Sequence, residues 1–83
     1  RVCGLLRWTS VPLRPLPYRE VRRKLEAAGF TEVSQRGSHV KFVRYTEAGV
    51  YTATVPRHRE IAIGTLRSIL RQAHLSPDEF DSL

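Results

Sequence analysis

The side chains best suited to proton transfer in this chain are three histidines, His39, His58 and His74. Histidine is the residue that takes up and releases protons near neutral pH. His39 follows a Gly-Ser dipeptide and comes two residues before Lys41, and positions 39 and 41 of a strand lie on one face. A histidine beside a cation suits a phosphodiester, because it can take the proton of a ribose 2′-hydroxyl or give one to the leaving oxygen.

The run before His39 has the properties of a phosphate-binding turn. Gly37 can adopt a positive φ, and the amides of Gly37 and Ser38, with the Ser38 hydroxyl, could bind a phosphate oxygen. Arg36 and Lys41 would add positive charge. We interpret His39 as the candidate catalytic residue and Arg36, Gly37, Ser38 and Lys41 as RNA-binding candidates. The alternative is that Gly37 and Ser38 only form a tight turn between strands.

The other two histidines have less informative surroundings. His58 follows Pro56 in an irregular segment, where it could be a second acid or base, could orient a substrate, or could bond a backbone carbonyl. The structural role is favoured, because no cluster of partners adjoins it in sequence. His74 is expected in the last turn of a helix, where positive charge suits the helix dipole, and is interpreted as structural.

Other chemistries find little support. The chain has no glycine-rich phosphate loop and no histidine or cysteine spacing typical of zinc. Its acidic residues are scattered, whereas a two-metal nuclease needs clustered carboxylates, and Ser38 lacks the flanking glycines of a hydrolase elbow. No metal and no other cofactor is expected.

Composition favours a polyanionic partner. The 83 residues suffice for one domain, and the net charge is +6, with 14 Lys and Arg against 8 Asp and Glu. Most of the basic residues are arginines, whose planar fork of donors suits phosphate. This favours nucleic acid, although arginine-rich chains also arise simply from GC-rich genomes.

The remaining composition bears on location. The single cysteine, Cys3, excludes a disulfide within the chain and fits a reducing cytosol, so a cytoplasmic location is expected. The apolar stretch at residues 2–8 is too short to span a bilayer and is interrupted by Arg7, so no membrane association is expected.

The hydrophobic pattern predicts a first helix followed by three strands. A helix is expected over residues 18–28, with Val21, Leu25 and Ala28 as its apolar stripe and Gly29 as its stop. Four basic residues are expected off that stripe: Arg19, Arg22, Arg23 and Lys24. Strands are expected over residues 30–36, 38–45 and 50–55, with Phe30 and Val33 as apolar anchors of the first.

Two more helices are expected after the strands. One begins near Gly64 and carries the helical repeat Leu66, Ile69, Leu70 and Ala73. A short one follows Ser76, which forms a capping box with Glu79, and Phe80 is its expected anchor. The order is α-β-β-β-α plus a terminal helix, an α+β two-layer sandwich with both main helices on one sheet face and the opposite face free for a partner. The domain is expected over residues 14–83, and residues 1–13 are interpreted as a disordered or artificially added extension.

Three stretches together resemble the HicA toxin family of bacterial toxin–antitoxin systems. They are residues 21–30 (VRRKLEAAGF), 36–42 (RGSHVKF) and 55–75 (VPRHREIAIGTLRSILRQAHL). The similarity extends from about Leu16 to Phe80. The Gly-Ser-His run alone is weak evidence, but its combination with Val-Pro-x-His and Gly-Thr-Leu-Arg-x-Ile-Leu-Arg is specific.

The resemblance implies a fold like that of double-stranded-RNA-binding domains. It also implies a metal-independent endoribonuclease, an mRNA interferase, that cuts mRNA and is silenced by a HicB-type antitoxin. The catalytic histidine of the family motif coincides with His39, and the Val-Pro-x-His step places His58 among the RNA-binding candidates. The sequence departs from many relatives at the end of the second main helix. It reads Ala73-His74-Leu75 there, whereas many relatives have a glycine near the position of His74.

Two other functions stay open on the sequence. A non-catalytic module that binds double-stranded RNA by shape and phosphate contacts needs only the fold and the charge. A protein-interaction domain whose basic face meets an acidic partner is the second alternative. The binding module predicts RNA that is shifted in a gel but intact. The resemblance joins the protein-interaction alternative to the toxin interpretation, since a cognate antitoxin would cover the active face.

Overall fold

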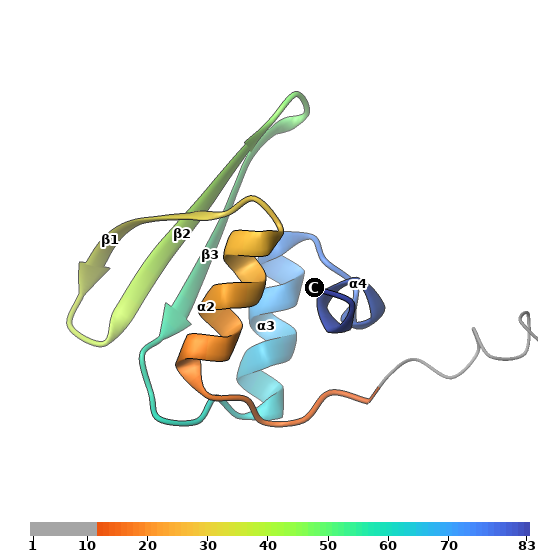
Figure 1. The fold of residues 1–83 in the computed structure, drawn as a ribbon. Coiled ribbons are helices and arrows are strands. Elements are labelled where there is room, and N and C mark those ends of the chain that lie inside the picture. Colours follow the sequence, from red (N-terminus) through yellow and green to blue (C-terminus); the bar gives the residue numbers. More distant parts are fainter. Residues whose placement is uncertain (1–11) are drawn as a thin grey trace, which may run out of the picture.

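The computed structural model describes residues 12–83. The elements, in chain order, are α2 (Tyr18–Ala27), β1 (Thr31–Arg36), β2 (His39–Thr46), β3 (Gly49–Pro56), α3 (Ile63–Ala73) and α4 (Pro77–Asp81) (Figure 1). This order confirms the expected α+β arrangement with a short C-terminal helix. Residues 1–11, the larger part of the expected extension, lie outside the described residues. No helix within residues 12–83 has both the length and the hydrophobicity that crossing a membrane requires.

The three strands form an antiparallel sheet in the order β1-β2-β3. The pairing of β2 with β3 runs without interruption from His39 opposite Pro56 to Thr46 opposite Gly49. The pairing of β1 with β2 shifts between Glu32 and Ser34, which makes Val33 the extra residue of a bulge.

This bulge overturns one expectation from the sequence. Val33 is 49% exposed, so it is not an apolar anchor of β1. Phe30 is buried as expected, although it lies just before the strand begins. Alternation of apolar and polar residues predicts which side chains face the core only where the strand is regular. An extra residue in a bulge moves the side chains that follow it to the opposite faces.

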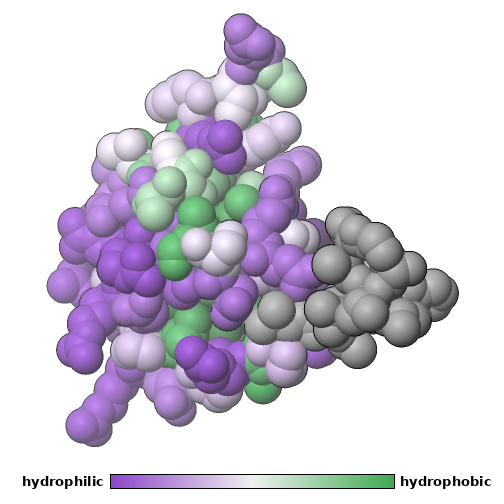
Figure 2. Space-filling model, turned by 45° about the vertical axis from the view of Figure 1, so that its right-hand side comes forward, coloured by the Kyte–Doolittle hydropathy of each residue, from purple (hydrophilic) through white to green (hydrophobic). Residues whose placement is uncertain are grey.

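Both main helices pack on the same face of the sheet, as Figure 1 shows. The core on that face combines alternate strand residues with the apolar stripes of the helices: Val40, Phe42, Ala53 and Val55 with Val21, Leu25, Leu66, Ile69, Leu70 and Ala73. The expected stripe of α3 is therefore confirmed. Figure 2 views the molecule from the helix side, where hydrophilic side chains cover most of the surface.

Both main helices end in the same local structure. In α2 the Phe30 N–H bonds the Leu25 carbonyl at 2.9 Å, and in α3 the Leu75 N–H bonds the Leu70 carbonyl at 3.0 Å. This is the Schellman motif, which needs a left-handed residue just after the helix. Gly29 fills that place with φ 100°, as expected of the stop.

In α3 the left-handed residue is His74, with φ 59°. His74 thus follows the helix instead of lying in its last turn. The short α4 begins as the sequence predicts, since Ser76 and Glu79 exchange both bonds of a capping box. Phe80 is buried in the core and is the anchor of α4.

Lys24 differs from its expected position off the apolar stripe of α2. Its side chain is buried, and its ammonium donates to the carbonyl oxygens of Phe80 at 3.1 Å, Asp81 at 3.3 Å and Leu83 at 3.1 Å. A helix leaves its last carbonyls without intrahelical partners, and Lys24 supplies a donor there, although the Phe80 carbonyl also accepts from the Leu83 N–H at 3.2 Å and the Leu83 oxygen from Arg23 at 3.5 Å. Lys24 therefore joins α2 to the end of α4.

Candidate nucleic-acid interface

The expected site residues share the sheet face that the helices leave uncovered. Side chains directly opposite each other in an antiparallel pair lie on the same face. We call this surface the open face; it comprises Thr31, Ser34 and Arg36 of β1, His39, Lys41, Val43 and Tyr45 of β2, and Val50, Thr52, Thr54 and Pro56 of β3. His39 and Lys41 are exposed while the intervening Val40 is buried, so the expected common face of His39 and Lys41 is confirmed.

An open depression of about 470 Å³ lies at one end of the open face. It is lined by Ser34, Gln35, Arg36, His39, Lys41 and Thr54. The structure thus brings three of the predicted site residues together: Arg36, His39 and Lys41. Gly37 and Ser38 form the exposed turn that connects Arg36 to His39.

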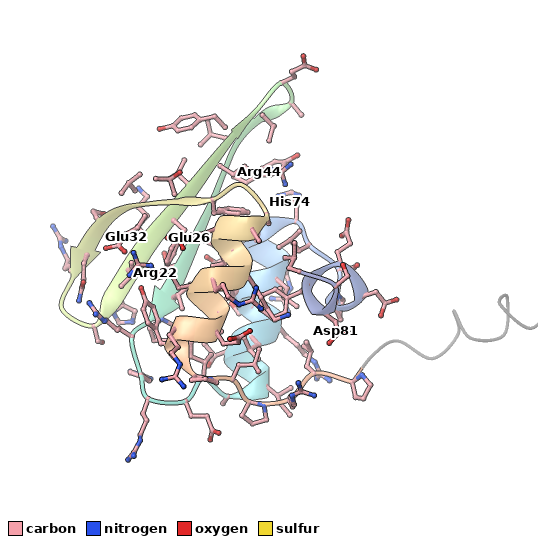
Figure 3. The ribbon with its side chains drawn as sticks, in the orientation of Figure 1. Arg22, Glu26, Glu32, Arg44, His74 and Asp81 are labelled. Carbon is pink, nitrogen blue, oxygen red and sulfur yellow. The ribbon has the colours of Figure 1, made fainter. Side chains whose placement is uncertain are left out.

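Among the residues that the structure describes, the depression is lined by basic and neutral side chains and by no carboxylate. Within residues 12–83, the side chains of Arg36, His39 and Lys41 form no hydrogen bond or ion pair. The open face as defined above contains no carboxylate. Glu32 of β1 pairs with Phe42 and so points to the helix side. There its carboxylate lies 3.9 Å from the guanidinium of Arg22 (Figure 3).

The acidic residues of α2 form ion pairs with arginines of the same helix. Arg22 bonds Glu26 at 3.2 Å, as Figure 3 shows, and Arg23 bonds Glu20. The bond from Arg23 lowers the pKa of Glu20. In the part of the chain that the structure describes, no group of three or more His, Cys, Asp or Glu side chains could hold a metal ion.

The turn before His39 depends on glycine. Gly37 has φ 60° while Ser38 does not have a positive φ. A two-residue hairpin turn with glycine in the first position and a positive φ only there is typical of type II′. A β-carbon added at Gly37 would meet no atom within 4 Å, so backbone conformation and not space accounts for the glycine.

Two residues that the sequence analysis did not single out hold this turn. The Gln35 side chain donates to the Gly37 carbonyl at 2.9 Å and accepts from the Arg57 guanidinium at 3.3 Å. The Arg57 backbone N–H donates to the Ser38 carbonyl. The pairing of Pro56 with His39 brings residue 57 beside the turn, a register that the sequence alone does not reveal.

Tyr18 supports Arg57 from the first helix. The guanidinium carbon of Arg57 lies 5.4 Å from the centre of the Tyr18 ring, a separation typical of a cation–π contact. Burial, with a smaller contribution from Glu32, raises the pKa of the Tyr18 phenol. The ring is therefore a neutral platform for the guanidinium at neutral pH.

The other two histidines lie apart from the depression. His58 is exposed, its backbone N–H donates to the Pro56 carbonyl at 2.9 Å, and its side chain does not line the depression. The His74 ring stacks on Tyr51, with ring centres 4.1 Å apart and planes 13° apart. Figure 3 shows His74 beside Arg44, on the helix side of the sheet.

Comparison with known proteins points to one family. The chain finds no match among curated proteins. The family described as HicA toxin of bacterial toxin–antitoxin systems matches residues 18–75. That range begins with α2 and ends just after α3, and it contains the Gly-Ser-His turn and all three strands. The chain therefore belongs to the HicA toxin family.

Proposed function

We propose that this chain is a metal-independent endoribonuclease that cleaves mRNA in the cytoplasm and is inhibited by a cognate HicB-type antitoxin. Family membership supports a toxin of a toxin–antitoxin pair. The observation that carries ribonuclease activity is the group formed by His39, Arg36 and Lys41 around one depression. It combines a proton acceptor with two cations on a face that contains no carboxylate.

The geometry suits cleavage by the ribose 2′-hydroxyl. His39 acts as the general base and removes the 2′-hydroxyl proton, the 2′-oxygen forms a bond to the adjacent phosphorus, and the bond from phosphorus to the 5′-oxygen breaks. The leaving 5′-oxygen takes a proton from water, which reaches the open depression. The products are a 2′,3′-cyclic phosphate and a 5′-hydroxyl end.

Arg36 and Lys41 supply the electrostatic part of this mechanism. Negative charge grows on the phosphate oxygens in the transition state, and cations already in place stabilise it. Neither side chain must break an ion pair first, because neither forms one within residues 12–83. His58 is assigned to binding RNA outside the depression, and the exposed Gly37 and Ser38 amides to binding phosphate beside His39.

The experiment incubates the purified chain with single-stranded RNA in the presence of EDTA. His39→Ala is expected to lower the cleavage rate by roughly 100- to 10,000-fold while circular dichroism shows an unchanged fold. His74→Ala is the matched control, because His74 lies apart from the depression and should leave cleavage intact. Undiminished cleavage by folded His39→Ala would overturn the assignment.

A non-catalytic module that binds double-stranded RNA is the second candidate. The fold and the positive charge favour it, because such modules bind by shape and phosphate contacts. The same incubation separates the two, since a module of this kind shifts RNA in a gel and leaves it intact. Addition of the antitoxin encoded beside this chain should suppress cleavage if the toxin assignment holds.

A further inference from the structure

The open face extends beyond the depression to an apolar end near the β2–β3 turn. Tyr45 of β2 lies opposite Val50 of β3, and Val43 lies opposite Thr52. We call Val43, Tyr45 and Val50 the apolar end of the open face. His39 and Tyr45 are six positions apart on one strand, so they are separated by about 20 Å along the same face.

Exposure distinguishes this end from the rest of the molecule. Tyr45 is 75% exposed and Val50 is 57% exposed; among the residues described, Val33 in the β1 bulge is the one other large hydrophobic that is exposed. Val43 is 6% exposed although it does not belong to the core under the helices. Val43 is therefore shielded from solvent, whereas its neighbours on the open face, Tyr45 and Val50, are not.

We propose that Tyr45 is a stacking platform for an unpaired base of the RNA whose backbone is bound at Arg36, His39 and Lys41. This inference rests on the proposed ribonuclease function and adds a second contact, distant from the cleaved bond. Exposed aromatic rings on sheets stack bases of single-stranded RNA, and adjacent cations hold the backbone. Both parts are present here on one continuous surface.

The charge of the surface argues for RNA as the occupant. Between Tyr45 and His39 the open face presents Lys41 and neutral side chains, and Arg36 lies opposite His39. No carboxylate of the open face would repel a phosphate chain that crosses it. A single-stranded RNA that follows β2 from the depression would meet the Tyr45 ring with bases some nucleotides from the cleaved phosphate.

The test uses the full chain and a single-stranded RNA that the wild type cleaves at a mapped position. A fluorescent 2′-O-methyl version of this RNA lacks the attacking hydroxyl, so its anisotropy reports binding alone. A series of such oligonucleotides carries one abasic nucleotide at successive positions on either side of the mapped bond. Tyr45→Ala and Tyr45→Phe are measured with each, and thermal melting confirms their folds.

Tyr45→Ala is expected to weaken binding of the intact oligonucleotide roughly 5- to 150-fold, whereas Tyr45→Phe, which keeps the ring, should bind like the wild type. At one position away from the cleaved bond, an abasic nucleotide should weaken binding by the wild type. The same oligonucleotide should bind Tyr45→Ala as well as the intact oligonucleotide does. Equal binding and cleavage by wild type and Tyr45→Ala would overturn the stacking proposal.

The two proposals fail differently. A wild type that neither binds nor cleaves RNA contradicts the proposed function itself. A wild type that cleaves RNA, together with a Tyr45→Ala variant that cleaves equally well and loses only inhibition by the antitoxin, assigns the apolar end to a protein partner. That result would overturn the base-stacking role and leave the ribonuclease intact.

Discussion

The backbone N–H of Arg57 donates a hydrogen bond to the carbonyl oxygen of Ser38. Ser38 belongs to the turn before His39, and Arg57 belongs to the segment that follows β3. This bond therefore connects the Gly-Ser-His turn with the Val-Pro-x-His step, which are distant in sequence. The Gln35 side chain adds a second connection, because it bonds both the Gly37 carbonyl and the Arg57 guanidinium.

Gln35→Leu removes both of these side-chain bonds at nearly constant size. We expect the free energy of unfolding to fall by about 1 kcal/mol and RNA cleavage to fall roughly tenfold, because the looser turn positions His39 less well. Ser82→Ala is the control, since the Ser82 hydroxyl also donates to a backbone carbonyl, that of Glu79 at 2.8 Å, but lies at the end of α4. This control should lose a similar amount of unfolding free energy but cleave RNA at the wild-type rate. Equal cleavage by both variants would contradict a positioning role for Gln35.

Gly37→Ala and Gly64→Ala should have opposite effects on stability. A β-carbon meets nothing within 4 Å at either glycine, so backbone conformation decides. Gly37 has φ 60°, and alanine there should cost about 1–2 kcal/mol. Gly64 lies in α3, where alanine should add about 0.4–1 kcal/mol. Urea denaturation of the two variants measures both changes, and a destabilised Gly64→Ala would contradict this account.

Regular periodicity explains which parts of the fold the sequence predicts. The stripe of α3 and the capping box at Ser76 depend on neighbours within a few residues, and both are confirmed. The exposure of Val33 results from a bulge that no local pattern marks. Lys24 is three positions from Val21, on the buried side of α2, and is satisfied by carbonyls of a helix that follows much later in the chain.

In the candidate site, too, the sequence predicts features set by neighbouring residues and not those set by contacts between distant segments. Residue alternation places His39 and Lys41 on one face, because only the geometry of a single strand is involved. Gln35 and Arg57 could not be assigned, because their contacts depend on the register between strands and on the path of the chain after Pro56. Arg57 lies outside the helices and strands, so no repeating pattern predicts which way its side chain points.

Lys24→Met should destabilise the fold far more than a change at a neighbouring exposed cation. Methionine keeps most of the buried volume but removes one donor from each of the carbonyls of Phe80, Asp81 and Leu83. Phe80 retains the Leu83 N–H and Leu83 retains Arg23, whereas Asp81 loses the donor that Lys24 gave it. We expect a loss of about 1.5–3 kcal/mol in the free energy of unfolding. Arg23→Met removes an exposed ion pair with Glu20 and a long 3.5 Å bond to Leu83, and should cost less than about 1 kcal/mol. Equal losses in urea denaturation would show that Lys24 contributes little more than a surface charge.

His74 combines a strained backbone with a favourable ring contact, and two substitutions separate these effects. His74→Ala keeps φ near 59° with a β-carbon and loses the stack on Tyr51, so it should cost about 0.5–1.5 kcal/mol. His74→Gly also loses the stack, but glycine relieves the left-handed conformation by about 1 kcal/mol, so its stability should stay close to that of the wild type.

Thermal or urea denaturation of the three proteins under identical conditions measures the comparison. A glycine variant no more stable than the alanine variant would mean that the Schellman motif at the end of α3 imposes no strain on His74. RNA cleavage by both variants should equal that of the wild type, because the His74 ring lies against Tyr51 and outside the depression. A loss of cleavage without a loss of fold would instead connect this end of α3 with the site.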